Sequence, residues 1–194
     1  VRPQRPAGVQ EAGRDRWREA LNNRPAMGYV LAYACHIWEL FGWRAWLVAF
    51  LVAAPALQLA QAEATRLATV ALMLGLPASV LGNELSLRIG RRKALTAIML
   101  VSAGCTLTLG LAAEAPAWLL LALVLASGVT ITADSGSLTA GAVGAVEPER
   151  RGALMTIHTL AGFGIGFVSP LVFGLTLDLA GGTNTPVAWA WAFG

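Results

Sequence analysis

Charged side chains are scarce in this chain of 194 residues, because Asp, Glu, Lys and Arg make up only 13% of it. Soluble proteins carry roughly 25%. Hydrophobic residues account for 56% of the chain, and its mean hydropathy is +0.62. These values argue against a soluble enzyme, a nucleic-acid-binding protein and a disordered protein.

Cysteine and histidine are also rare, with two residues of each. Cys35 and Cys105 lie inside apolar segments, where we expect them to pack as small hydrophobic side chains and to form no disulfide. His36 begins an H-x-x-E sequence without the second histidine of a zinc-protease motif, and no phosphate-binding loop is present. We therefore expect no enzyme activity, no cofactor and no metal site.

Six long runs contain no charged residue, and most of them match the roughly 20 residues that a helix needs to cross a bilayer. They predict an all-α, polytopic transmembrane helical bundle whose last helix is cut short. The expected spans are 25–57, 66–87, 93–113, 117–145, 152–179 and 187–194. The chain begins on Val1 with no signal peptide and stops within an apolar run, so we expect a fragment.

Basic residues predict the orientation of this membrane domain, residues 25–194. Twelve of them fall in segments 1–24, 88–93 and 147–151, which the spans place on one side, whereas the opposite loops hold only Arg66. That side is expected to be cytoplasmic, in a cell membrane. The polar segment 1–24 is interpreted either as a short helix on the membrane surface or as a solvated linker.

The first predicted span carries His36 and Glu39, which are costly in hydrocarbon. Helical spacing places them on one face with Tyr29 and Trp43. This aromatic and polar face indicates a water-filled cavity with Glu39 as a proton or cation site. The alternative is that His36 and Glu39 satisfy each other and fix helix packing.

Later spans add further polar candidates. The fourth carries Thr130, Asp134 and Ser137 on one face, and Asp134 is its only charged residue. A lone carboxylate within a span must find a partner or stay protonated, so Asp134 is either functional or a tie to a neighbouring helix. His158 in the fifth span is interpreted as an interhelical packing residue or a proton relay.

The loop after the second span reads Gly-Asn-Glu-Leu-Ser-Leu-Arg-Ile-Gly-Arg-Arg-Lys over residues 82–93. It resembles the loop motif of the major facilitator superfamily (MFS) of transporters, approximately G-x-x-x-D-[RK]-x-G-[RK]-[RK]. Gly82 and Gly90 stand one residue too far apart, and Leu87 occupies the aspartate position. Glu84, four residues before Arg88, is a candidate for the missing carboxylate.

A second loop, Glu-Pro-Glu-Arg-Arg-Gly over 147–152, resembles the acidic and basic loop that follows a later helix in the same family. Its carboxylates are expected to face the basic cluster 88–93 and form a conformational latch. The expected latch residues are Gly82, Glu84, Arg88, Gly90, Arg91, Arg92, Glu149 and Arg151.

The resemblance implies that the spans are helices 7 to 11 and the start of 12 of a twelve-helix transporter whose N-terminal half is missing here. It further implies a secondary active transporter that moves a small solute by alternating access, with Glu39 and Asp134 as candidate proton-coupling or substrate residues. A passive facilitator and a membrane sensor or scaffold remain alternatives. The expected partners are a small-molecule substrate, protons and the lipid bilayer, with no nucleic acid. The expected pathway residues are Tyr29, His36, Glu39, Trp43, Thr130, Asp134, Ser137 and His158.

Overall fold

The computed structural model describes residues 17–194, which are helical over most of their length and contain no strand. The prediction of an all-α fold is therefore confirmed for this part of the chain. A short helical stretch over 17–22 precedes the first long helix; the rest of the predicted linker, 1–16, lies outside the described residues. The helices are α2 (Arg24–Ala53), α3 (Gln61–Ile89), α4 (Arg91–Leu111), α5 (Ala117–Ala133), α6 (Ser135–Gly144), the short 3-10 helix η1 (Pro148–Arg150), α7 (Arg151–Leu179) and α8 (Pro186–Phe193).

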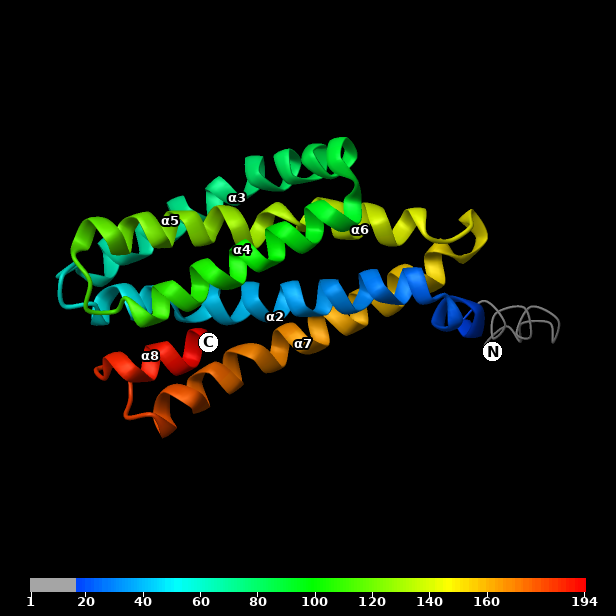
Figure 1. The fold of residues 1–194 in the computed structure, drawn as a ribbon. Helices are drawn as coiled ribbons and strands as arrows, with labels where there is room; N and C mark the ends of the chain where they lie inside the picture. The colour runs from blue at the N-terminus through cyan, green and yellow to red at the C-terminus, as the bar shows by residue number, and fades with distance from the viewer. Residues whose placement is uncertain (1–16) are drawn as a thin grey trace, which may run out of the picture.

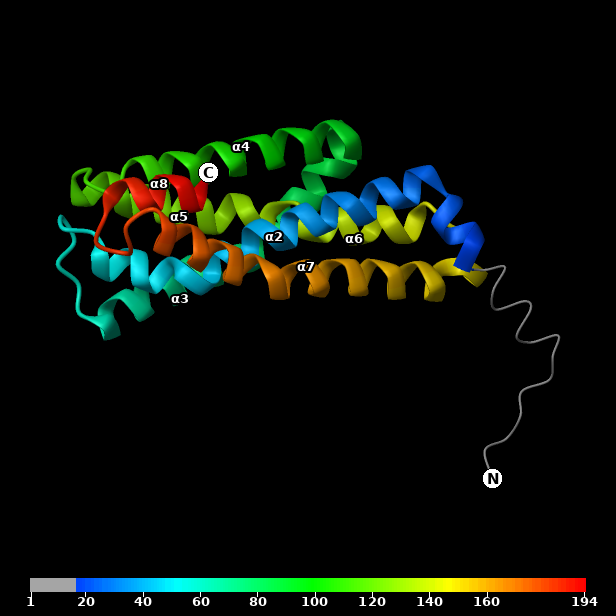
Figure 2. The ribbon, with the colours of Figure 1, turned by 90° about the horizontal axis from the view of Figure 1, so that it is seen from below.

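Five helical segments are long and apolar enough to cross a membrane, with α5 and α6 together forming one of them. They run back and forth along one elongated bundle, so that the α3–α4 turn and the α6–α7 connection lie towards one end (Figures 1 and 2). The remaining connections lie at the other end. This is the arrangement of a multi-spanning helical membrane protein.

The span expected over 117–145 forms one membrane-spanning segment, Ala117–Gly144. A single turn residue, Asp134, separates α5 from α6 within it. The backbone of Asp134 keeps right-handed helical angles (φ −86°, ψ −20°). The apolar pattern therefore continues through the interruption, and hydropathy alone does not reveal it.

Helices α2 and α7 lie side by side and run in the same direction (Figure 1). Small residues of α7 face large residues of α2 in a constant register. Gly162 lies against the Tyr33 ring, and Gly166 against Ile37 and Phe41. Farther along the pair, the Ser169 hydroxyl donates a hydrogen bond of 2.6 Å to the Trp38 carbonyl oxygen. A row of small side chains thus lets the two helices approach closely.

A second close approach joins α3 to the end of α5. A methyl group on Gly82 would overlap the carbonyl oxygen of Ala133, so the two backbones pack without a side chain between them. Gly90 follows α3 with φ +92°, a conformation that glycine adopts without strain, and it begins the turn into α4. These glycines bring α3 and α4 against the interruption at Asp134.

Candidate functional site

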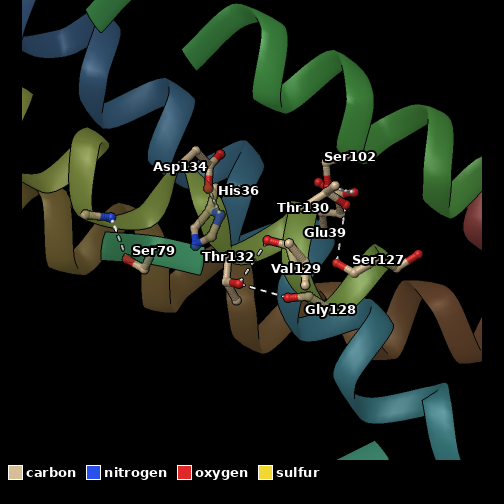
Figure 3. Close-up of polar contacts among 11 residues, drawn as sticks. His36, Glu39, Ser79, Ser102, Ser127, Gly128, Val129, Thr130, Thr132 and Asp134 are labelled. Atoms are coloured by element: carbon tan, nitrogen blue, oxygen red, sulfur yellow. Dashed lines mark hydrogen bonds and ion pairs between the residues drawn. The ribbon is translucent and has the colours of Figure 1, made fainter. Parts of the chain in front are cut away.

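A buried pair of ionisable side chains joins α2 to the α5–α6 interruption. His36 Nδ1 lies 2.8 Å from Asp134 Oδ1, and both side chains are at most 4% exposed. The two atoms are close enough for an ion pair, but neither has a hydrogen-bonding partner of good geometry among the described residues. Figure 3 shows the imidazole of His36 directed at the carboxylate. Asp134 therefore ties α5 and α6 to α2, and His36 is its partner rather than that of Glu39.

Side chains from α3 and α4 form hydrogen bonds with backbone groups that follow Asp134 in α6. The Ser79 hydroxyl accepts a hydrogen bond of 3.1 Å from the Gly136 N–H (Figure 3). Arg91 donates one of 2.7 Å from its guanidinium to the Ser137 carbonyl oxygen. Polar backbone groups within a membrane need such internal partners. The interruption is thus satisfied by two residues that the apolar pattern does not identify.

Glu39 has a different environment, although it lies only one helical turn beyond His36. The hydroxyls of Ser102 and Thr106 both donate to its Oε1 atom, at 2.8 and 3.1 Å. Its other oxygen, Oε2, accepts no hydrogen bond from the described residues, and none of the ion pairs among them includes Glu39. The carboxylate is therefore held by neutral hydroxyls and has no basic partner in this part of the chain.

Helix α4 supplies those hydroxyls, so one of its faces contacts α2 through polar side chains. Ser102 and Thr106 are buried, at 2% and 5% exposure. The opposite side of α4 remains exposed, with Leu100 and Leu111 among its apolar side chains. Its sequence has few polar residues, but two of them stand four positions apart and share the face towards α2.

A cavity of about 380 Å³ opens beside Glu39, between α2, α4, α7 and α8. Cys35 and Trp38 line it from α2 and also line a neighbouring cavity of about 230 Å³. Its main polar and aromatic lining residues are Trp38, Glu39, Trp43, Thr106, Phe173 and Phe193. The predicted pathway residues Glu39 and Trp43 therefore meet at a cavity, and His36 and Asp134 are absent from its lining.

The other predicted pathway residues lie in helix contacts. Tyr29 packs against Gly141 of α6, and the hydroxyl of Thr130 donates to backbone carbonyls of its own helix. Ser137 is fully buried, with no hydrogen-bonding partner for its hydroxyl among the described residues. His158 is also buried and stacks on the Tyr33 ring at a centroid distance of 3.8 Å.

The expected cytoplasmic latch is only partly assembled. Arg88 and Glu84 form an exposed ion pair of 3.0 Å along α3, and Arg91 reaches α6. Among residues 17–194, however, no ion pair joins the cluster 88–93 to the loop 147–152. Arg150 pairs instead with Glu19, at 2.8 Å, and with Glu147, at 3.7 Å.

The separation of these two loops has a simple cause. Helix α6 extends beyond the α3–α4 turn, so the loop that follows it lies farther along the bundle (Figures 1 and 2). Glu149 and Arg151 are exposed there, and Arg92 is exposed beside the turn. The expectation that carboxylates 147 and 149 face the cluster 88–93 is therefore wrong for this conformation.

Sequence reasoning did not identify Ser79, Ser102 or Thr106 as site residues. Each is a small hydroxyl residue, and such residues also occur in membrane helices as ordinary packing positions. The i, i+4 spacing of Ser102 and Thr106 is a usable signal once a carboxylate is known to lie opposite. Comparison of the chain with protein-family models, curated proteins and solved structures found no match.

Proposed function

We propose that this chain is part of a secondary active transporter in the cell membrane, which moves a small solute by alternating access with proton coupling through Glu39 or Asp134. Its N-terminal segment lies in the cytoplasm. The observation that carries the proposal is the position of Glu39, a carboxylate near the middle of α2 that is held by two hydroxyls at the edge of a cavity.

A carboxylate in this position is expensive. Insertion of an aspartate or arginine at the centre of a membrane helix costs about 2.5–3.5 kcal/mol, and such residues mark ion and substrate pathways. A packing role for Glu39 would be better served by a neutral side chain, since its partners are hydroxyls. A role in proton exchange requires a group that alternates between ionised and protonated forms, and this would explain why a carboxylate occupies the position.

The His36–Asp134 pair gives the proposal a second titratable site. It lies at the junction of α5 and α6, inside one membrane-spanning segment, and ionisable residues inside such segments mark candidate proton or substrate pathways. Protonation of Asp134 would weaken its attraction to His36 and loosen the tie between α2 and the α5–α6 segment. Coupling at Asp134 would therefore act through helix packing, whereas coupling at Glu39 would act at the cavity.

The resemblance of residues 82–93 to the MFS loop motif supports a specific architecture for the complete protein. In that architecture this chain is the C-terminal six-helix half, and a second half closes the pathway. The twelve basic residues on one side of the predicted topology support the cytoplasmic assignment.

The test is proton movement in proteoliposomes that contain the full-length protein and an enclosed pH indicator. Sugars, amino acids, organic cations and organic anions are added separately. We expect one class to evoke proton flux, and Glu39→Gln or Asp134→Asn to abolish it. Glu63→Gln changes an exposed carboxylate outside this site and should leave the flux intact.

Other outcomes identify the alternatives. Solute entry without proton movement, unaffected by either neutralisation, would indicate a passive facilitator. If no solute class enters and no protons move, the transporter proposal is wrong. A membrane sensor or scaffold would also keep its ligand response after neutralisation of Glu39 and Asp134.

A further inference from the structure

We infer that the cavity beside Glu39 is a binding site for an organic cation, an amine or quaternary ammonium group carried on an apolar body. The inference rests on the proposed function in one respect only, since it names the substrate class of the same cavity. The observations that carry it are the charge of the lining and its aromatic residues.

The charge of the lining has one sign. Among the described residues that line it, Glu39 is the only ionisable one apart from the thiol of Cys35, and none is Lys, Arg or His. A carboxylate oxygen without a donor among the described residues is therefore left at the cavity edge. A cation would balance its charge, whereas an anionic solute would not.

Aromatic rings form much of the remaining wall. Trp38 and Trp43 come from α2, Phe173 from α7 and Phe193 from α8. Ring faces attract ammonium groups, by about 0.5–1 kcal/mol at exposed sites and more when water is excluded. Rings from three helices beside one carboxylate form the kind of wall that recognises an alkylated ammonium group.

The described residues argue against a metal ion. No group of three or more His, Cys, Asp or Glu in the described chain could hold a metal ion. An organic cation needs only one carboxylate and an apolar surface.

The described part of the cavity has room for such a ligand. Its volume is about 380 Å³, and its lining reaches Phe193 and Gly194, the last residues of the sequence. The neighbouring cavity of about 230 Å³, lined by Ala34, Cys35, Trp38 and Ile165, is almost wholly apolar. Since Cys35 and Trp38 border both cavities, the second one offers space for the apolar body of the ligand.

The first experiment measures binding to the full-length protein in detergent by equilibrium dialysis, with protein-free micelles as the blank. The probe is benzyltrimethylammonium, whose charge is permanent, and its neutral isostere neopentylbenzene is the comparison. We expect the cation to bind more tightly than the isostere. Glu39→Gln should weaken cation binding at least tenfold, and Trp38→Leu should weaken it about threefold.

Glu114→Gln is the matched control, because Glu114 is an exposed carboxylate in the connection between α4 and α5. It should leave the affinity for benzyltrimethylammonium unchanged. The side-chain amide introduced by Glu39→Gln keeps a carbonyl oxygen that can accept from Ser102 and Thr106, so this variant should remain folded.

Cys35 provides a second measurement that locates the ligand. It is an exposed free thiol on the wall of both cavities, whereas Cys105 lines neither of them. Bound benzyltrimethylammonium should slow the reaction of Cys35 with N-ethylmaleimide and leave that of Cys105 unchanged, as measured by peptide mass spectrometry. Glu39→Gln should remove the protection.

Equal affinity for the cation and its neutral isostere, with no effect of Glu39→Gln, would overturn the inference. So would binding that leaves Cys35 unprotected. If the cation fails to bind while Glu39-dependent proton flux persists with another solute class, the inference fails and the proposed function stands. If the cation binds at Cys35 but no solute moves, the proposed function fails and the site remains.

Discussion

Asp134 and Glu39 are both carboxylates near the middle of membrane-spanning segments, and both contact a neighbouring helix. Asp134 is 3% exposed and faces a histidine, in a position where helices α2, α5 and α6 meet. Glu39 faces two hydroxyls and borders a cavity. The comparison shows that the partner and the free space, rather than the carboxylate itself, determine what each group can do.

The difference has a direct consequence for ligands. The charge of Asp134 has a counterion within the protein when His36 is protonated, and neither residue lines the cavity beside Glu39. The carboxylate of Glu39 has hydrogen-bond donors but no counterion in the described chain. A ligand that brings a positive charge therefore fits Glu39 and has no comparable place at Asp134.

The largest predicted effect tests whether Asp134 is chiefly a structural tie. Asp134→Leu should lower the free energy of unfolding by about 3 kcal/mol, because it leaves His36 buried without its partner. Thermal unfolding in detergent measures the loss. The double variant His36→Leu with Asp134→Leu should recover much of it. A double variant that equals the sum of the two single losses would contradict the pairing.

The second effect tests the close packing around Asp134. Gly82→Ala should lower the free energy of unfolding by about 1–3 kcal/mol, because the added methyl group meets the Ala133 carbonyl oxygen. Gly104→Ala is the control, since nothing lies within 4 Å of a methyl group there. It should be neutral or stabilise the helix by up to about 1 kcal/mol. An equal change in the free energy of unfolding for both variants would mean that α3 does not pack closely against the end of α5.

A smaller effect is expected at Arg91, which holds the Ser137 carbonyl oxygen beside the interruption. Arg91→Ala should destabilise the protein by about 1–2 kcal/mol and slow solute transport while leaving solute affinity largely intact. Arg92→Ala changes an exposed neighbour, with no hydrogen bond from its side chain in the described chain, and should do neither. A large loss of affinity at normal turnover would contradict the role of Arg91.

The smallest effect on stability is expected at Glu39. Glu39→Gln should change the free energy of unfolding by less than about 1 kcal/mol, because the amide oxygen can accept both hydroxyl hydrogen bonds. Thermal unfolding is measured on the same preparation as the transport assay. A loss as large as that of Asp134→Leu would show that the two carboxylates share a structural role and would remove the contrast between them.

The sequence predicted the helices well because each hydrophobic run has to be long enough to cross the bilayer. It also singled out His36, Glu39 and Asp134, since charge within such runs is conspicuous. It did not predict which of them would pair. Helical spacing assigns residues to a face, but the helix that covers that face depends on packing between segments about a hundred residues apart.

The contacts made by small residues were also not predicted from the sequence. Gly162, Gly166 and Ser169 share a face in the sequence, and the structure places that face against α2. A Gly-x-x-x-Gly spacing alone, however, does not name its partner. The turn at Asp134 was not predicted, because the flanking residues, Thr132, Ala133 and Ser135, are as apolar or small as those of any other membrane helix.

Helix α2 also has the lowest mean hydropathy of the five membrane-spanning segments. Its polar groups find partners only on helices that the ribosome makes later: Ser102 and Thr106 on α4 for Glu39, and Asp134 for His36. The polar groups of α2 therefore lack these partners until α4 and the α5–α6 segment have packed against it.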